Sequence, residues 1–111
     1  MSALIWSPFP DAEAAEAAAR ALLAERLVAC ANILPAMRSL FVWQGKAQDS
    51  AEAGALFKTD ATLLARAIAR LGELHPYASP AILGWRCDAA HPATAQWLAV
   101  LGQPPGCPPA A

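Results

Sequence analysis

The order of apolar segments along the chain constrains its fold more than any other feature of the sequence. Residues 3–7 are apolar and end at two closely spaced prolines, which predicts a short strand. Residues 12–26 follow with alanine and leucine on one side and Asp11 as a suitable N-cap, which predicts a helix. Residues 27–34 are again apolar, and propensity alone does not separate helix from strand there, but Asn32 and the proline at position 35 argue against a continued helix.

The second half of the chain continues this alternation. Aromatic and β-branched side chains over residues 39–43 predict a strand, and a bend at residues 44–46 returns the chain into a weaker strand over residues 51–58. Helical spacing predicts a second helix from Asp60 to Gly72. A rigid loop, a strand and a last helix are expected after it, over residues 75–80, 81–87 and 92–101 in that order.

This order of elements is that of a ferredoxin-like α+β sandwich (βαββαβ) with an added C-terminal helix. Such a fold has an antiparallel sheet with both main helices on one face. We therefore expect one domain over residues 1–102 and a disordered tail, rich in proline and glycine, over residues 103–111. The composition agrees, because 29 of the 111 residues are alanine and the larger apolar side chains suffice for a single core.

The second face of such a sheet has no helix to cover it. Phe41, Trp43 and Trp85 lie on predicted strands, and four tryptophans are many for so small a core. We therefore expect identical copies of the chain to associate through this face.

Charge and hydropathy exclude several classes of function. The net charge is −1 and the eight lysines and arginines are scattered, so binding to nucleic acid is not expected. The sequence offers no apolar run long enough for a membrane helix and no secretory signal, so we expect a cytoplasmic protein without membrane contact. Motifs of phosphate-binding loops and hydrolases are absent from the sequence, so no enzymatic activity is predicted.

The three cysteines do not indicate a disulfide framework or a zinc ribbon, because no CxxC spacing occurs. Cys30 and Cys87 are expected as small buried side chains, and Cys107 is expected to be exposed in the tail. Cys87, Asp88 and His91 are three potential metal ligands close in sequence. A stable zinc site normally needs about four ligands, so this spacing does not predict one.

Several segments resemble the divalent-cation tolerance (CutA) family, in the order and at the spacing of that family. They span residues 4 to about 101 and comprise residues 23–35, residues 39–46, Glu52, Lys58–Thr59 and His75–Tyr77 with Pro80. The resemblance implies a ferredoxin-like protomer in a tight homotrimer, whose second and third strands pair with neighbouring subunits. It also implies a role in tolerance of copper and other divalent cations, in a family not known for enzymatic activity.

Of the metal ligands that the resemblance implies, this chain has only some. Copper-binding members have a cysteine at the end of the first strand and two histidines before the Pro-Tyr pair, where this chain has Ser7, Leu74 and His75. Ala81 stands where many members have a carboxylate. His75 is therefore the candidate ligand for copper or another divalent cation. Loss of metal binding is the alternative, because copper prefers several thiolate or imidazole ligands.

Other residues have a functional and a structural interpretation. His75 either binds a metal or lines a pocket, or its ring hydrogen-bonds the loop backbone and fixes the turn. The charges near the bend either hold an anion in a cleft between subunits or form ion pairs around a packed interface. The residues expected to line this ligand cleft are Trp43, Lys46, Glu52, Lys58 and Tyr77. A third hypothesis is an enzyme that uses Lys46, Glu52 and His75.

Overall fold

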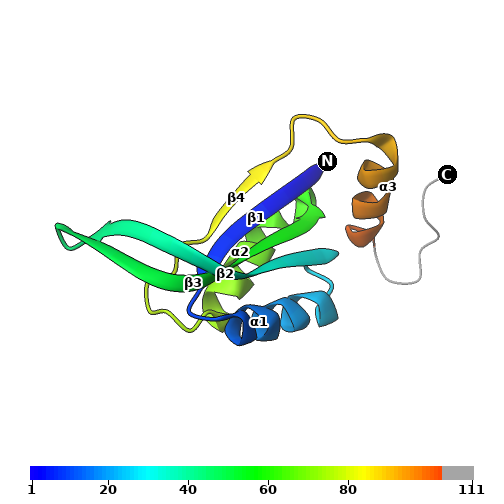
Figure 1. Ribbon diagram of the computed structural model, residues 1–111. Helices are drawn as coiled ribbons and strands as arrows, with labels where there is room; N and C mark the ends of the chain where they lie inside the picture. The colour runs from blue at the N-terminus through cyan, green and yellow to red at the C-terminus, as the bar shows by residue number, and fades with distance from the viewer. Residues whose placement is uncertain (104–111) are drawn as a thin grey trace.

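In the computed structural model, which describes residues 1–103, four antiparallel strands form one sheet in the order β2-β3-β1-β4 (Figure 1). The ferredoxin-like α+β fold with an added C-terminal helix, predicted from the sequence, is thus confirmed. The predicted disordered tail lies, from residue 104 on, outside the described residues. The elements are β1 (Ser2–Phe9), α1 (Ala12–Ala24), β2 (Cys30–Trp43), β3 (Lys46–Asp60), the 3₁₀ helix η1 (Ala61–Leu63), α2 (Leu64–Leu74), β4 (Leu83–Arg86) and α3 (Pro92–Leu101).

β1 continues through Pro8 to Phe9, although the sequence predicts its end at residue 7. β4 pairs with β1 only from Ala3 to Trp6, so the last part of β1 has a strand on one side alone. A proline is tolerated there, because no second neighbour requires a hydrogen bond from it.

β2 is one continuous strand, whereas the sequence predicts a strand over residues 39–43 and leaves residues 27–34 open between helix and strand. Leu34 pairs with Gly54 and Met37 pairs with Glu52, so two residues of β2 lie opposite one residue of β3. This β-bulge accommodates Pro35, and β2 is an edge strand of the sheet, where a missing N–H is tolerated. The proline therefore bends the strand without ending it.

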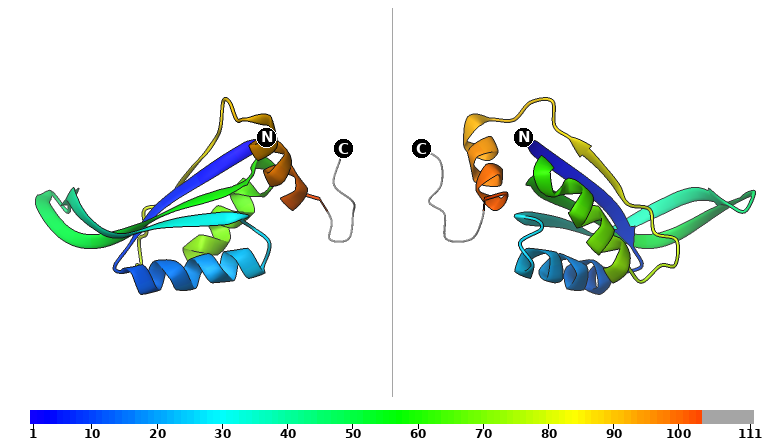
Figure 2. Two further views of the ribbon diagram at one scale, coloured as in Figure 1. Left: turned by 45° about the vertical axis from the view of Figure 1, so that its right-hand side comes forward. Right: turned by 180° about the vertical axis from the view of Figure 1, so that it is seen from behind.

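The hairpin of β2 and β3 extends well beyond the rest of the sheet. Gln44 and Gly45 form a two-residue turn with φ values of 50° and 79°, as a type I′ turn requires. β1 pairs with β3 only as far as Ala53, so the part of the hairpin beyond it is two-stranded. We call residues 37–52 the arm. It projects from the body in all three ribbon views (Figures 1 and 2).

The face of the sheet toward α1 and α2 holds the core. Ile5 and Phe9 of β1 and Phe57 of β3 point to this side and are fully buried against Leu22 of α1. Ala15, also fully buried, lets α1 lie close to the sheet. The alanine-rich helix predicted from the sequence thus serves close packing.

The opposite face, which we call the open face, carries no helix over its centre within residues 1–103 (Figure 2). Trp6 lies across Gly54, where an added Cβ would be 2.3 Å from the indole ring. Exposed apolar side chains surround this contact. They are Leu34, Leu83 and Trp85 over the body and Phe41 and Trp43 on the arm.

The prediction that Cys30 and Cys87 are buried is wrong, because both are half-buried. Cys30 begins the edge strand β2, and Cys87 follows the opposite edge strand β4, so each has a strand on one side only. Cys107 lies outside the described residues. The helices within residues 1–103 are all too short or too polar to span a membrane.

Candidate functional site

The loop between α2 and β4 is held against the end of β1; we call residues 75–82 the HPY loop. The Nε2 atom of His75 lies 2.8 Å from the carbonyl oxygen of Pro8, and its Nδ1 atom accepts the backbone N–H of Tyr77 over 3.2 Å. The imidazole stacks on Phe9, with ring centroids 4.3 Å apart. A ring that accepts at Nδ1 and donates at Nε2 is the neutral tautomer. These contacts agree with the structural interpretation of His75, in which the ring hydrogen-bonds the loop backbone and fixes the turn.

The environment of His75 also favours its neutral form. The residue is only 7% exposed, and burial lowers the pKa of His75 below its ordinary value of 6.5, against the opposing effects of the Pro8 carbonyl and the charge of Glu52. Both ring nitrogens are engaged. A metal ion at His75 therefore requires the ring to give up one of its two hydrogen bonds.

The other positions of the expected copper site serve the loop and the core. Ser7 is fully buried, and its hydroxyl donates to the carbonyl oxygen of Ala81 over 2.8 Å. Leu74, at the end of α2, packs against the core. Ser7 therefore anchors the HPY loop to β1.

Residues 1–103 contain no group of three or more His, Cys, Asp or Glu side chains that could hold a metal ion. His91, near Cys87 and Asp88 in sequence, accepts the N–H of Ala93 over 3.1 Å and so caps α3. The side chains of residues 1–103 therefore do not supply the group of thiolate or imidazole ligands that copper prefers. Metal binding at His75 stays a prediction.

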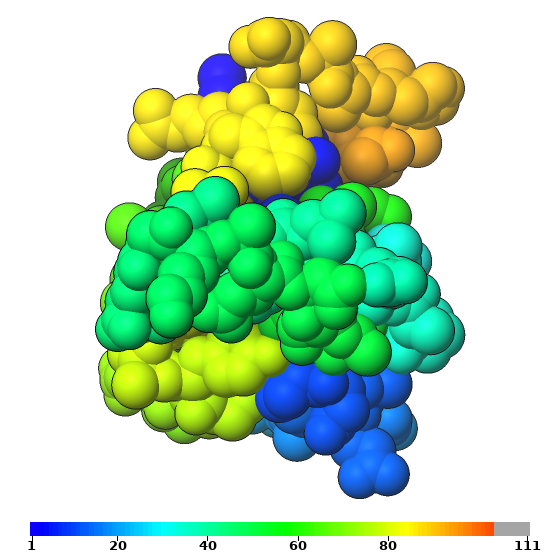
Figure 3. Space-filling view, turned by 60° about the vertical axis from the view of Figure 1, so that its left-hand side comes forward, coloured from blue at the N-terminus to red at the C-terminus, as the bar shows by residue number. Residues whose placement is uncertain are grey.

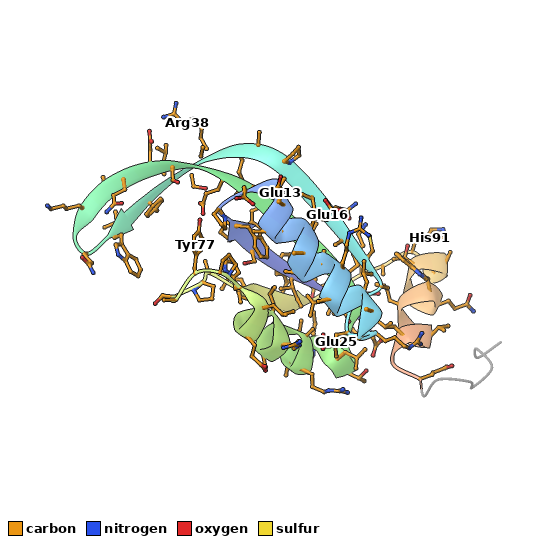
Figure 4. The ribbon with its side chains drawn as sticks, turned by 90° about the horizontal axis from the view of Figure 1, so that it is seen from below. Glu13, Glu16, Glu25, Arg38, Tyr77 and His91 are labelled. Carbon is orange, nitrogen blue, oxygen red and sulfur yellow. The ribbon has the colours of Figure 1, made fainter. Side chains whose placement is uncertain are left out.

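Tyr77 joins the HPY loop to the arm. Its hydroxyl donates to the Oε2 atom of Glu52 over 2.7 Å, and in Figure 4 the side chain rises from the loop toward the β2–β3 ribbon. Burial, followed by this hydrogen bond and the charges of Glu52 and Asp11, raises the pKa of Tyr77 from 10.0 to about 12. The hydroxyl therefore stays protonated at neutral pH and serves as a donor.

An open groove of about 620 Å³ lies between the arm and the HPY loop. The space-filling view along the arm shows the surface of the loop directly against that of the arm (Figure 3). Glu52 and Tyr77 contribute polar groups to the groove, and Trp43 contributes an aromatic ring. The other lining residues are Pro8, Ser39, Phe41, Val42, Ser50, Ala78, Ser79 and Ala81.

The two lysines expected in the cleft do not line this groove. Lys46, Glu52 and Lys58 share one face of β3, because their positions differ by even numbers. Lys46 begins the strand beside the hairpin turn, and Lys58 lies near its other end, opposite Cys30. Each is six residues from Glu52, roughly 20 Å along an extended strand. Within one chain, Lys46 does not meet Glu52 and His75 to form the hypothesised catalytic set.

Sequence reasoning missed several contributors to this site. Ser39 and Ser50 pair across β2 and β3 and line the groove beside Glu52. Phe9 was not singled out, although it supports the ring of His75. The alternation of side chains along β1 could have indicated that Phe9 is buried beside the loop, because it places Ser7 and Phe9 on the same side of the sheet as Ile5.

The fold and the groove define a class: a ferredoxin-like α+β protein with a projecting hairpin, an open sheet face and a ligand-sized groove between hairpin and loop. Residues 3–100 match the family described as CutA1 divalent ion tolerance protein, and the chain belongs to this family. The family assignment and the function in divalent-cation tolerance predicted from the sequence are thereby confirmed.

Relatives agree in sequence and in structure. The divalent-cation tolerance protein CutA of Pyrococcus horikoshii is 40% identical over 95 residues, which cover 86% of this chain and 92% of the relative. The crystal structure of CutA from Xylella fastidiosa has a TM-score of 0.85 at 37% identity, covering 90% of this chain and 96% of that one. The structure of CutA from Archaeoglobus fulgidus, described as a periplasmic divalent cation tolerance protein, has a TM-score of 0.86 at 27% identity, covering 93% and 100%.

Proposed function

We propose that this protein contributes to divalent-cation tolerance as a non-enzymatic binding protein, and that it works as a homotrimer in the cytoplasm. The open face supports the proposed assembly. Leu83 and Trp85 on β4 are 65% and 45% exposed. Apolar patches of this kind mark interaction surfaces.

The arm supports the same assembly. A two-stranded hairpin is marginally stable in water by itself, and unpaired strand edges invite pairing with another chain. Residues 37–52 form such a hairpin beyond the reach of β1. In the proposed trimer, neighbouring copies pair with the free strand edges of the arm and cover Leu83 and Trp85 on the open face.

Native mass spectrometry of the full chain, alone and with added copper or zinc, tests this proposal. We expect the mass of three chains. Uptake of ions by the trimer, lost in His75→Gln, would support His75 as the metal ligand. A trimer that stays metal-free would remove that role, and the mass of one chain in all samples would contradict the assembly. Circular dichroism of the variant separates lost binding from lost folding, and cell fractionation tests the cytoplasmic location.

One observation favours a second function for the same assembly. Both ring nitrogens of His75 hold the HPY loop in place, and the adjacent groove has the volume of a small-molecule site. We propose as the alternative a trimer that has lost metal binding and binds a small organic ligand through Trp43, Glu52 and Tyr77. A metal-free trimer in the same mass spectra, together with saturable binding of an organic ligand, is the result it requires.

A further inference from the structure

The charge of the groove between the arm and the HPY loop indicates what it binds. Glu52 is the only charged residue among those that line it. Within residues 1–103, no lysine or arginine forms a salt bridge with the Glu52 carboxylate. Its Oε2 atom accepts the Tyr77 hydroxyl, which carries no charge to offset the carboxylate. The groove therefore attracts a cation, whereas the sequence suggested that a lysine holds an anion there.

The walls of the groove identify the kind of cation. A hard divalent ion takes about six or more oxygen ligands, usually from several carboxylates, and a transition metal takes nitrogen or sulfur ligands. One carboxylate and a few hydroxyls supply neither set, and no histidine or cysteine lines the groove. A bare metal ion is therefore poorly matched to this surface.

Apolar and aromatic side chains form most of the remaining wall. Phe41 and Trp43 come from the arm, and Pro8 and Ala81 come from the body and the loop. Aromatic rings attract an ammonium group through their faces and also bury apolar carbon. A volume of about 620 Å³ lies within the usual range for small-ligand pockets.

We propose that the groove is a binding site for a small organic cation, a protonated amine with an apolar or aromatic body. The ammonium group pairs with the free side of the Glu52 carboxylate, and the body lies against Phe41 and Trp43. Tyr77 positions the carboxylate through its hydroxyl. This inference rests on the second of the two proposed functions, in which the groove binds an organic ligand.

Isothermal titration calorimetry of the full chain with three probes of one shape tests the site. The probes are 2-phenylethylammonium, the neutral 2-phenylethanol and the anion phenylacetate. We expect saturable binding of the ammonium probe, with the alcohol and the anion weaker by roughly tenfold or more, because a hydrogen bond to a charged group is lost. Added salt should weaken the ammonium probe and leave the alcohol unchanged.

Two variants locate the effect. Glu52→Gln should weaken the ammonium probe by roughly tenfold and leave the alcohol unchanged. Glu13→Gln makes the same chemical change on α1, outside the residues that line the groove, and should leave both unchanged. The comparison of probes on the unaltered chain stands even if Glu52→Gln fails to fold.

Three results would overturn the inference. They are preference for phenylacetate, equal loss in Glu52→Gln and Glu13→Gln, and no saturable binding of the ammonium probe, the result expected if a neighbouring copy fills the groove. Native mass spectrometry reports assembly and metal uptake without the amine. A failed titration with an intact, metal-free trimer therefore rejects the organic cation and leaves the proposed assembly standing.

Discussion

The two faces of the sheet are formed by the same strands but differ in how far their apolar side chains are buried. Toward α1 and α2, alternate residues of β1 and β3 such as Ile5 and Phe57 are fully buried. On the open face, Leu83 and Trp85 remain largely exposed, although they pair directly with Trp6 and Leu4 of β1. Within residues 1–103, α1 and α2 cover the first face, and no helix lies over the centre of the second. Stability therefore resides on the helix side, and we place association and ligand binding on the open side.

The HPY loop connects the two faces. It begins at His75, which is buried against Phe9 on the helix side, and it reaches Glu52 on the open side through Tyr77. Because Ser7 and His75 both fix the loop to β1, the position of Tyr77 follows from the packing of the core. Changes on either face thus separate the contributions to folding from those to binding.

Removing a large side chain from the helix side should have the largest effect. Phe57→Ala leaves a cavity among fully buried residues and should lower the free energy of unfolding by about 3–5 kcal/mol. Leu23→Ala, on the exposed side of α1, should change it by about 0.5 kcal/mol or less. Urea unfolding at one protein concentration measures both. Similar losses in the two variants would contradict a core confined to the helix side.

Truncating a tryptophan on the open face should weaken association instead. Trp85→Ala should cost about 2 kcal/mol or more in trimer formation, as aromatic anchors of interfaces do. Trp97→Ala on α3 is a matched control, because the two side chains are 45% and 47% exposed. Sedimentation equilibrium measures the association constants. Equal effects of the two variants would refute a specific role for the open face.

A methyl group at Gly54 should disturb the contact between Trp6 and Gly54 on the open face. Gly54→Ala places a Cβ 2.3 Å from the Trp6 ring and should destabilise the fold by about 1–3 kcal/mol. Gly72→Ala meets no atom within 4 Å and lies in α2, so it should stabilise by about 0.5–1 kcal/mol. Thermal unfolding of both variants gives opposite shifts, and shifts of one sign would disprove the contact.

The smallest effect is expected at the link between loop and arm. Tyr77 is the only tyrosine, so absorbance titration reports its pKa of about 12 directly. The neutral hydroxyl is favoured in the folded chain, so its stabilisation is present below pH 10.0 and is lost as the pH rises through 10.0 toward 12.

Two variants test the hydrogen bond between Tyr77 and Glu52. Glu52→Gln should lower the pKa of Tyr77 without returning it to 10.0, because burial remains the main cause. Tyr77→Phe should cost about 1 kcal/mol of stability for the lost hydrogen bond. An unchanged pKa of Tyr77 in Glu52→Gln would show that the two side chains do not interact.

The order and type of the elements could be predicted from the sequence, because apolar runs, helical spacing and prolines act locally. Their lengths could not. Pro8 and Pro35 both lie within strands, since each stands where the sheet has a neighbour on one side only or a bulge. Whether a proline ends a strand thus depends on the neighbouring strands, which the local sequence does not reveal.

The residues of the site were partly predictable, and their arrangement was not. Trp43, Glu52 and Tyr77 come together in a groove of one chain, and Lys46 and Lys58 lie outside it; the predicted cleft between subunits stays a prediction. The contact between Tyr77 and Glu52 spans 25 positions in sequence and depends on how the HPY loop turns around β1. Because that turn brings the uncharged Tyr77 to Glu52, and neither lysine lines the groove, the groove carries a negative charge.

Hydrogen–deuterium exchange of the unaltered chain tests most directly whether the open face is completed by other copies. The arm, residues 37–52, is two-stranded within one chain and would exchange quickly if it stood free in solution. We predict that its amides are protected nearly as well as those of β1, and that dilution removes this protection from the arm first. Rapid exchange of the arm at every concentration, with β1 fully protected, would contradict the proposed assembly.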